Sequence, residues 1–256
     1  NELYYSGEHK DLQREAHTLS KKDILAIKGL AQFKKFPTAA ALGELIESWH
    51  ISDFHITQAK SIQDDGDAEH LSREGENLSL VAKYMFEQHN EVFNKILDKL
   101  KNRVPGINSV VAKLTDEGRV LLKFQDENFK DPFLARYVSD GTIKMFAYLI
   151  LLNDPIPHSL LCIEEPENQL YPKLLMELAE EFREYSLRGG QVFISTHSPD
   201  FLNALEIEEV FWLEKKDGFS IIKRAMEDSN ISNLIEEGDK MGYLWKQGLF
   251  GEVHPK

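Results

Sequence analysis

The sequence predicts a mixed α/β protein in which a crossover helix joins parallel strands. Two apolar runs, 159–163 and 191–195, flank an amphipathic segment, 170–182, and this order of strand, helix and strand forces a parallel pair. Two further stretches, 110–124 and 210–222, each carry paired apolar runs around a turn sequence, which predicts antiparallel hairpins. A content of 42% hydrophobic and 29% charged residues in 256 is typical of a globular protein with a substantial core.

The first 75 residues predict short elements of mixed type. Alternation at 3–5 and near 24–27 suggests edge strands, and 38–49 reads as a helix. Residues 51–56 have some strand character. The polar, acidic stretch 61–75 predicts a loop.

The middle of the chain predicts one long amphipathic helix and a hairpin. From the capping residue Asn77, apolar side chains recur at helical spacing as far as Pro105 and Gly106, which break helices. The hairpin strands, 110–114 and 120–124, flank a turn that contains Gly118.

The last part of the chain holds the crossover unit and a second hairpin. Residues 143–152 are apolar nearly all round, which predicts a buried helix. The helix at 170–182 ends at Gly189 and Gly190. Its predicted outer face carries the glutamates Glu177, Glu180, Glu181 and Glu184. The second hairpin turns at Asp217 and Gly218.

The charge and the cysteine content restrict the setting and the partners. A net charge of −13 disfavours binding of nucleic acid phosphates, although residues 1–60 carry eight basic and eight acidic side chains. If this chain binds DNA, the candidate patch is Lys21, Lys22, Lys28, Lys34 and Lys35. The longest apolar run, 145–152, is too short to cross a membrane. The single cysteine, Cys162, excludes a disulfide framework, so we expect a reducing, cytoplasmic setting.

Polar side chains follow both strands of the predicted parallel pair. Glu164 and Glu165 come directly after the strand that ends at Ile163, and His197 follows the strand that ends at Ser195. Ligands bind beyond the carboxyl ends of parallel strands, where such loops converge. Two adjacent carboxylates after a buried strand are costly unless a cation or a water-activating role accounts for them.

Three motifs resemble those of ABC-class ATPases and occur in the order typical of that class. Residues 160–165 look like a Walker B strand, 195–199 like a switch-histidine loop, and 138–142 like a signature motif. The sequence Ser-Asp-Gly-Thr before an apolar helix most resembles that of the bacterial AAA-family predicted ATPases related to the RecF and SMC heads. The close match covers 139–205. The resemblance implies part of a P-loop NTPase-like ABC/SMC-type ATPase head.

The resemblance also implies two lobes and a catalytic role for three side chains. Residues 1–135 would form a helical and hairpin lobe, and 136–256 would form the lobe with the three motifs. Glu165 would polarise the attacking water, and Glu164 would hold Mg²⁺ through its water shell. Glu164 stands where most relatives carry Asp, which puts the metal geometry in doubt. His197 would hydrogen-bond the γ-phosphate of ATP.

A head-to-head homodimer with ATP between the heads is the assembly that the resemblance implies. Ser139 and the Gly141 backbone open a helix whose N-terminus favours anions, and they would contact nucleotide held by the partner. The whole signature set is Ser139, Asp140, Gly141 and Thr142. Glu167 and Asn168 fall where the D-loop of the family crosses between subunits. A DNA or effector partner and the process that ATP turnover drives are not indicated.

A P-loop, Gly-x-x-x-x-Gly-Lys-Ser/Thr, is missing, since the sequence has no Gly-Lys dipeptide. We therefore expect the C-terminal part of a larger ATPase, inactive without its P-loop segment, and natural loss of the P-loop is the alternative. Gln58 has no flanking pattern that supports a Mg²⁺ contact.

Two other function classes stay open. The chain could be a non-catalytic scaffold or partner-docking module whose acidic pair has lost its role. It could also be a metal-dependent phosphoesterase that uses Glu164, Glu165 and His197, although only about fifty residues follow the last motif, which is short for an added nuclease domain.

Overall fold

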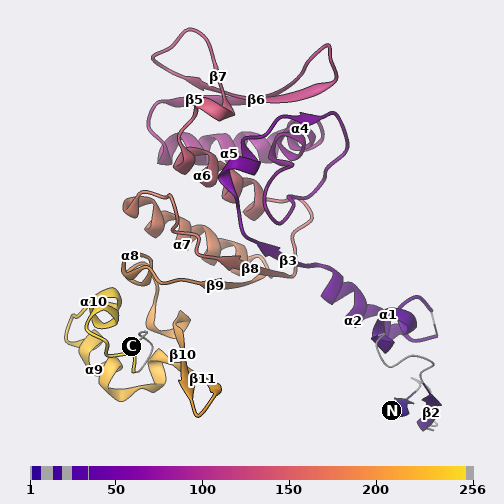
Figure 1. The fold of residues 1–256 in the computed structure, drawn as a ribbon, viewed down its shortest axis with the longest axis vertical. Helices are drawn as coiled ribbons and strands as arrows, with labels where there is room; N and C mark the ends of the chain where they lie inside the picture. Colours follow the sequence, from indigo (N-terminus) through magenta and orange to yellow (C-terminus); the bar gives the residue numbers. More distant parts are fainter. Residues whose placement is uncertain (1, 7–13, 19–24, 34, 252–256) are drawn as a thin grey trace. The chain divides into compact units, whose positions relative to one another are not determined.

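The computed structural model describes residues 2–6, 14–18, 25–33 and 35–251 (Figure 1). Contacts between residues divide the chain into two compact units. The smaller unit runs to His50 and includes 158–160, and the larger comprises 51–157 and 161–256. The lobes expected at 1–135 and 136–256 stay a prediction.

The smaller unit contains a hairpin and two helices. Its elements are β1 (Glu2–Ser6), β2 (Arg14–Thr18), α1 (Ala26–Leu30) and α2 (Pro37–Glu47), and β1 pairs antiparallel with β2. The edge strand predicted near 24–27 is wrong where the structure describes it, because Ala26 and Ile27 begin a helix; alternation over so few residues fits either conformation. Lys28 lies on α1, whereas Lys21, Lys22 and Lys34 of the basic cluster lie outside the described residues.

The first part of the larger unit packs two helices against an antiparallel sheet. Its elements are α3 (Ile56–Ala59), β4 (Gln63–Asp64), α4 (Leu78–Gln88), α5 (Asn90–Arg103), β5 (Ile107–Leu114), β6 (Arg119–Asp126), β7 (Phe133–Leu134) and a 3₁₀ turn (Ala135–Tyr137). The strand order is β4-β6-β5, with β7 also paired to β6. The predicted hairpin is confirmed, with Leu114 opposite Val120.

The single long helix predicted after Asn77 is wrong, because it is interrupted at His89. This residue has φ −133° and ψ 47°, outside the helical region. The His89 ring lies 3.1 Å from the Tyr84 hydroxyl. Met85 and Phe93 are both buried and eight residues apart, a separation that keeps helical phase across the break. The apolar spacing therefore gave no sign of the interruption.

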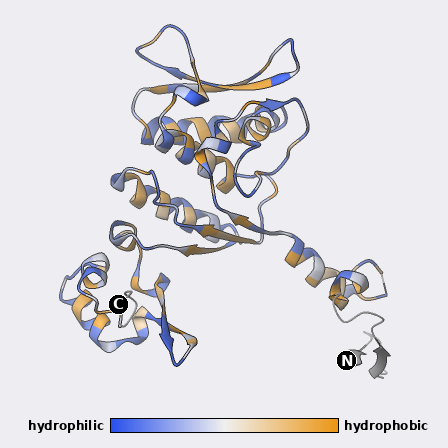
Figure 2. Ribbon diagram, in the orientation of Figure 1, coloured by the Kyte–Doolittle hydropathy of each residue, from blue (hydrophilic) through white to orange (hydrophobic). Residues whose placement is uncertain are grey.

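Helix α6 (Asp140–Leu152) forms the centre of the core. Every residue from Thr142 to Leu152 is buried, which confirms the predicted buried helix. Figure 2 colours the ribbon by hydropathy, and α6 is largely hydrophobic there. The Phe146 ring makes nearly perpendicular contacts with Phe124 and Phe93, at centroid distances of 5.6 and 6.4 Å. Edge-to-face pairs of this kind add to the stabilisation from buried area.

The crossover unit has the predicted topology. Strands β3 (Trp49–Ser52), β8 (Leu160–Glu164) and β9 (Gln191–Ser195) form a sheet in the order β3-β8-β9, and α7 (Pro172–Leu187) links β8 to β9. The Glu165 N–H donates to the Ser195 carbonyl at 2.9 Å, so β8 and β9 end side by side and run parallel. The α/β fold class is thus confirmed.

One glutamate on α7 faces inward, contrary to the predicted outer face. Glu181 is 2% exposed and accepts hydrogen bonds from Lys99 at 2.6 Å and from Arg103, both on α5. A buried carboxylate is tolerated when it is paired in this way. The apolar pattern of α7 could not reveal cations that lie about eighty residues earlier in the chain.

The C-terminal part of the larger unit has an apolar cluster of its own. Its elements are α8 (Pro199–Leu202), a 3₁₀ turn (Ile207–Glu209), β10 (Phe211–Lys216), β11 (Phe219–Arg224), a 3₁₀ turn (Ala225–Glu227), α9 (Ser229–Glu236) and α10 (Met241–Lys246). The hairpin predicted around Asp217 and Gly218 is confirmed. Trp212 packs its ring edge-on against Phe250, at 5.3 Å.

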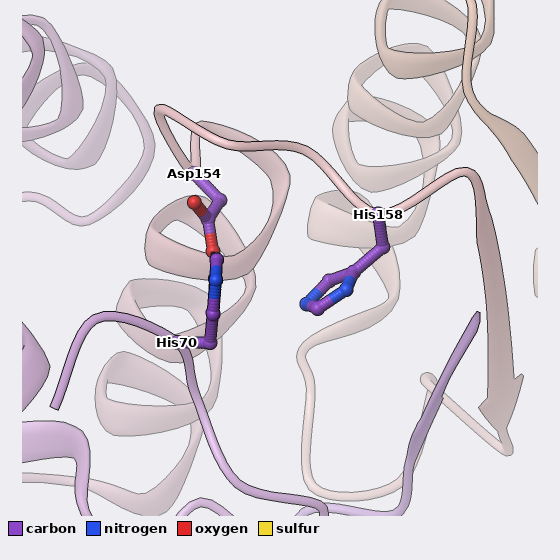
Figure 3. A group of neighbouring side chains, drawn as sticks. All are labelled: His70, Asp154 and His158. Carbon is purple, nitrogen blue, oxygen red and sulfur yellow. The ribbon is translucent and has the colours of Figure 1, made fainter. Parts of the chain in front are cut away.

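The stretch 61–75 is mostly loop, as predicted, and is tied to the end of α6. The His70 ring nitrogen Nδ1 lies 2.7 Å from the Asp154 carboxylate, and the two side chains meet end to end in Figure 3. Only 5% of the Asp154 side chain is exposed. Among the residues that the structure describes, no helix combines the length and apolar character of a membrane span.

Candidate active site

An open cavity of about 540 Å³ lies at the carboxyl edge of β3 and β8, within the larger unit. The loops after β3 and β8 and the start of α6 form its walls. Its lining residues are Asp53, Phe54, His55, Ile56, Thr57, Gln58, Asp140, Lys144, Glu164, Glu165, Asn168 and Gln169. The sequence placed Glu164, Glu165, Asp140 and Asn168 among its candidates, and the structure brings these four together.

The turn after β8 has an unusual backbone. Glu165 has φ 39° and Gln169 has φ 65°, and both values lie in the left-handed region that side chains with a Cβ rarely adopt. The turn is held by the hydrogen bond from the Glu165 N–H to the Ser195 carbonyl and by one from the Asn168 N–H to the Glu165 carbonyl, at 3.2 Å. Backbone in this conformation persists only where surrounding contacts impose it, and such residues cluster at functional sites.

The Glu165 carboxylate is oriented and accessible. Its Oε2 accepts a hydrogen bond from the Asn168 side-chain amide at 2.8 Å, and its Oε1 lies 4.0 Å from His197 Nε2. The Glu165 side chain is 44% exposed and the His197 side chain 79% exposed. Glu165 and His197 therefore flank a solvent-accessible point at the mouth of the cavity, although His197 does not line the cavity itself.

Glu167 holds the histidine loop within the same chain. Its Oε1 accepts hydrogen bonds from the Thr196 hydroxyl at 2.6 Å and from the His197 N–H at 3.2 Å. The Ser198 N–H in turn donates to the Thr196 hydroxyl at 3.0 Å. The turn after β8 thus positions the loop after β9. Glu167 and Asn168 were expected to face a second subunit, and the hydrogen bonds described for their side chains lie within one chain.

Ser139 caps the N-terminus of α6. Its Oγ accepts a hydrogen bond from the Thr142 N–H at 3.2 Å and lies 2.7 Å from the Thr142 hydroxyl. Ser139 is exposed, whereas Thr142 is buried. A Cβ added at Gly141 would lie 3.0 Å from the Gln169 carbonyl oxygen, so glycine here permits close packing of α6 against the turn after β8.

Lys144 is a buried cation on α6 beside this turn. Its side chain is 3% exposed, and its Nζ lies 3.4 Å from the Glu165 carbonyl oxygen. Burial lowers the pKa of Lys144 to about 8, and the nearby carboxylates of Glu167, Asp53 and Glu165 oppose this shift. The turn after β8 therefore carries a positive charge on its inner side.

Several residues at the site have no sequence signal. Asp53, His55 and Gln58 follow β3, whose position beside β8 is a property of the sheet and not of any motif. Gln58 lines the cavity although no flanking pattern marked it. Lys60, directly after α3, donates hydrogen bonds to Asp140 and to the Val138 carbonyl. A motif search could have found none of them, since each is defined by contact with residues far along the chain.

The cavity has the chemistry of a divalent-cation site. Four of the described lining residues are carboxylates, namely Asp53, Asp140, Glu164 and Glu165, and Lys144 is the one ammonium among them. Mg²⁺ prefers oxygen ligands and keeps several waters, which one or two protein carboxylates commonly hold. The residues present therefore fit Mg²⁺.

A family model described as "AAA domain, putative AbiEii toxin, Type IV TA system" matches residues 20–203. The match spans the turn at Ser139, the acidic pair Glu164 and Glu165 at the end of β8, and the His197 loop. The resemblance to AAA-family proteins that the motifs indicated is thereby confirmed. No curated protein matches the chain in sequence.

The solved structures similar to this chain include heads of SMC ATPases. One, from work on ATP-driven dimerization and DNA-stimulated activation of SMC ATPases, is 15% identical with a TM-score of 0.45, and the match covers 61% of this chain and 97% of that one. Another is the Smc head domain with a coiled coil and joint from Pyrococcus yayanosii, at 17% identity and a TM-score of 0.45, covering 61% of this chain and 31% of that chain.

Proposed function

Because the chain belongs to the AAA-domain family of the putative AbiEii toxin type, we propose that it is the motif-bearing part of an ATPase that hydrolyses ATP between two heads. The observation that carries this proposal is the Glu165 carboxylate. Asn168 orients it, it lines an acidic cavity, and it stands 4.0 Å from His197.

Glu165 would act on the attacking water. A carboxylate within hydrogen-bond reach of water can accept its proton as the oxygen attacks phosphorus. Asn168 fixes one carboxylate oxygen and leaves Oε1 for the water. His197, held by Glu167 through its backbone, would donate a hydrogen bond to the γ-phosphate as negative charge develops there.

Glu164 and the neighbouring carboxylates of the cavity would hold Mg²⁺. Glu164 is the last residue of β8 and is exposed to solvent at the cavity wall. When bound, the ion would neutralise charge on the phosphate oxygens of ATP. The long Glu164 side chain suits a contact through water.

The phosphates of ATP require a P-loop, and residues 1–256 have no Walker A sequence. We propose that a segment outside these residues supplies it. Residues 1–256 alone should therefore neither hydrolyse Mg-ATP nor bind it tightly. Low-micromolar ATP binding to this chain in a calorimetric titration would contradict the proposal.

Ser139 would act in trans, on nucleotide held by the second head. It is exposed at the start of a helix of 13 residues, and the N-terminus of a helix favours anions. Its Oγ accepts from the Thr142 N–H and lies 2.7 Å from the Thr142 hydroxyl, so Thr142 orients the hydroxyl that would donate to a phosphate of the second head. The Gly141 backbone lies beside it at the same helix end.

A mixed-dimer experiment tests both the ATPase and the trans contact. In the ATPase that contains this chain and its P-loop, Ser139→Arg and Glu165→Gln should each abolish most turnover. In a mixed dimer both lesions fall in one composite site and leave the other intact, so random exchange should restore about a quarter of wild-type turnover.

Two outcomes would count against the proposal. If exchange is shown by cross-linking and turnover stays at the single-mutant level, either the two sites are strictly coupled or Ser139 does not act in trans. A monomer by light scattering with ATP and Glu165→Gln present would show that there is no trans contact. If Glu165→Gln leaves turnover unchanged, the acidic pair is not catalytic, and the scaffold function gains support.

A further inference from the structure

One partly buried lysine, Lys60, donates hydrogen bonds to the residues on both sides of Ser139. Lys60 Nζ donates one hydrogen bond to Asp140 Oδ1 at 2.5 Å and another to the Val138 carbonyl at 2.7 Å. These two acceptors flank Ser139 in the sequence, so one ammonium group bridges the residue on either side of it. The Lys60 side chain is 16% exposed and the Asp140 side chain 51%, so the ammonium is shielded while its carboxylate partner remains open to solvent.

The Lys60 ammonium lies at the N-terminus of α6, the end of a helix at which a cation is unfavourable. Asp140 is the first residue of α6, where the helix dipole favours negative charge and disfavours a lysine. The Asp140 carboxylate compensates for this cost, and the Val138 carbonyl supplies a second acceptor. The contact therefore fixes a particular conformation of the turn and is not a chance encounter of surface charges.

Lys60 is also joined to the wall of the cavity through α3, three of whose residues, Ile56, Thr57 and Gln58, line it. It directly follows α3, and its N–H donates to the Ile56 carbonyl at 3.0 Å. Ile56 and Ala59 are buried, which anchors this short helix, and Gln58 between them lines the cavity. A displacement of α3 by a ligand in the cavity would thus be passed to the turn at Ser139 through a single side chain.

We propose that Lys60 is a positioning residue that holds Ser139 in place for the second subunit and links this turn to the cavity of its own subunit. The inference rests on the proposed function, because Ser139 needs a nucleotide on the partner to act upon. Lys60 itself touches neither nucleotide nor the reacting atoms.

A second ion pair of the larger unit provides a matched control. Lys83 Nζ also lies 2.5 Å from a carboxylate, that of Asp65, and its side chain is 19% exposed. This pair joins α4 to the loop at 61–75 and includes no cavity residue. Lys83→Met removes the same charge and the same kind of contact without affecting the turn.

The first measurement is turnover of the P-loop-containing ATPase with Lys60→Met, Lys60→Arg or Lys83→Met. We expect Lys60→Met to lower kcat by about 10- to 100-fold, the range for a misplaced contact group, with little change in KM. Lys60→Arg keeps the charge and the donors and should retain most of the turnover. Equal kcat values for Lys60→Met and Lys83→Met would overturn the proposal.

The second measurement is a pattern of complementation in mixed dimers. Lys60→Met should restore turnover when mixed with Glu165→Gln, because both lesions then share one composite site. Lys60→Met should not restore turnover when mixed with Ser139→Arg, because each composite site then contains a turn at residue 139 that one of the two substitutions disrupts. The reverse pattern would mean that Lys60 serves only its own cavity, which would overturn the proposal.

Hydrogen exchange separates a loosened turn from a misfolded protein. The Thr142 amide donates to Ser139 Oγ, so its exchange should become faster in Lys60→Met and stay unchanged in Lys83→Met. Unchanged exchange at Thr142 in Lys60→Met would overturn the positioning role. Suppose that Lys60→Met shows the faster Thr142 amide exchange and the lower kcat, but that Ser139→Arg does not complement Glu165→Gln. The proposed trans contact of Ser139 would then be wrong, whereas the positioning of Ser139 by Lys60 would stand.

Discussion

Among the residues that the structure describes, two turns carry non-glycine residues with positive φ, and they do so for different reasons. In the β10–β11 hairpin, Asp217 has φ 51° and is followed by Gly218 with φ 85°. Asp-Gly is a common sequence for such a turn, and aspartate tolerates the left-handed region. In the turn after β8, Glu165 and Gln169 have φ 39° and 65° without any local sequence that favours it.

The difference shows where tertiary structure imposes a conformation on the backbone. The hairpin turn is explained by its own two residues. The turn after β8 is held by Ser195 on the next strand and by the close approach of Gly141 to Gln169. Backbone in an unfavourable conformation that distant residues help to maintain is common at functional sites, which agrees with the role proposed for Glu165.

The largest effect should come from the carboxylate of the turn after β8. In the P-loop-containing ATPase, Glu165→Gln should lower turnover by about 10²–10⁴ and preserve ATP binding, since a positioned general base contributes that much. Asp217→Asn, in the hairpin turn, should leave turnover unchanged. Steady-state ATPase assays and nucleotide titrations test both variants, and similar rates would remove the distinction between the turns.

Lys144 gives the turn after β8 a buried charge that the hairpin turn lacks. The pKa of Lys144 falls from 10.5 to about 8 on folding, so the unfolded chain binds more protons between these values. The free energy of unfolding should therefore rise with pH from about 8 to 10.5. Below pH 8, Lys144→Met should be more stable than wild type by about 3 kcal/mol, at 1.36 kcal/mol for each pKa unit.

Urea unfolding at pH 7 and pH 10 measures this effect. Wild type and Lys144→Met should differ by about 3 kcal/mol at pH 7 and by less than about 1 kcal/mol at pH 10. A wild-type curve that runs parallel to that of Lys144→Met across this range would show that the ammonium is not destabilised by burial.

His197 tests whether the histidine loop belongs to the same site. His197→Ala should lower turnover on the order of 10²-fold, as expected when a donor to the transition state is removed. Glu167→Gln removes the charge that holds the Thr196 hydroxyl and the His197 N–H, so it should give a smaller loss in the same direction. Rapid-quench measurement of the hydrolysis step would reveal these losses. Undiminished hydrolysis in His197→Ala would assign the histidine to an ordinary surface loop.

The smallest effect concerns backbone strain itself. Gln169→Gly should raise the free energy of unfolding by about 1 kcal/mol, because glycine adopts positive φ without the cost of a Cβ. Asp217→Gly should change it less, since aspartate already tolerates this region. Chemical denaturation of both variants measures the change in the free energy of unfolding at each turn. An equal increase for Gln169→Gly and Asp217→Gly would contradict the view that tertiary contacts strain the backbone of the turn after β8.

The sequence by itself determined the parts of this protein that depend on near neighbours. Apolar runs of four or five residues predicted the strands at 159–163 and 191–195, which the structure has at 160–164 and 191–195, and the helix between them required a parallel pair. The turns at Gly118 and Gly218 fixed both hairpins. The order of three short motifs identified the family, since each motif needs particular residue types at fixed spacing.

Only the tertiary structure decided which distant residues meet. The break at His89 leaves the helical phase intact and so has no signal in the periodicity, and the inward position of Glu181 depends on cations of α5. Lys60 lies eighty residues before Asp140, and Gly141 is required by a carbonyl of the turn after β8. The physical reason is that periodicity and turn chemistry record local backbone preference, whereas a hydrogen bond between distant segments exists only after packing has brought them together.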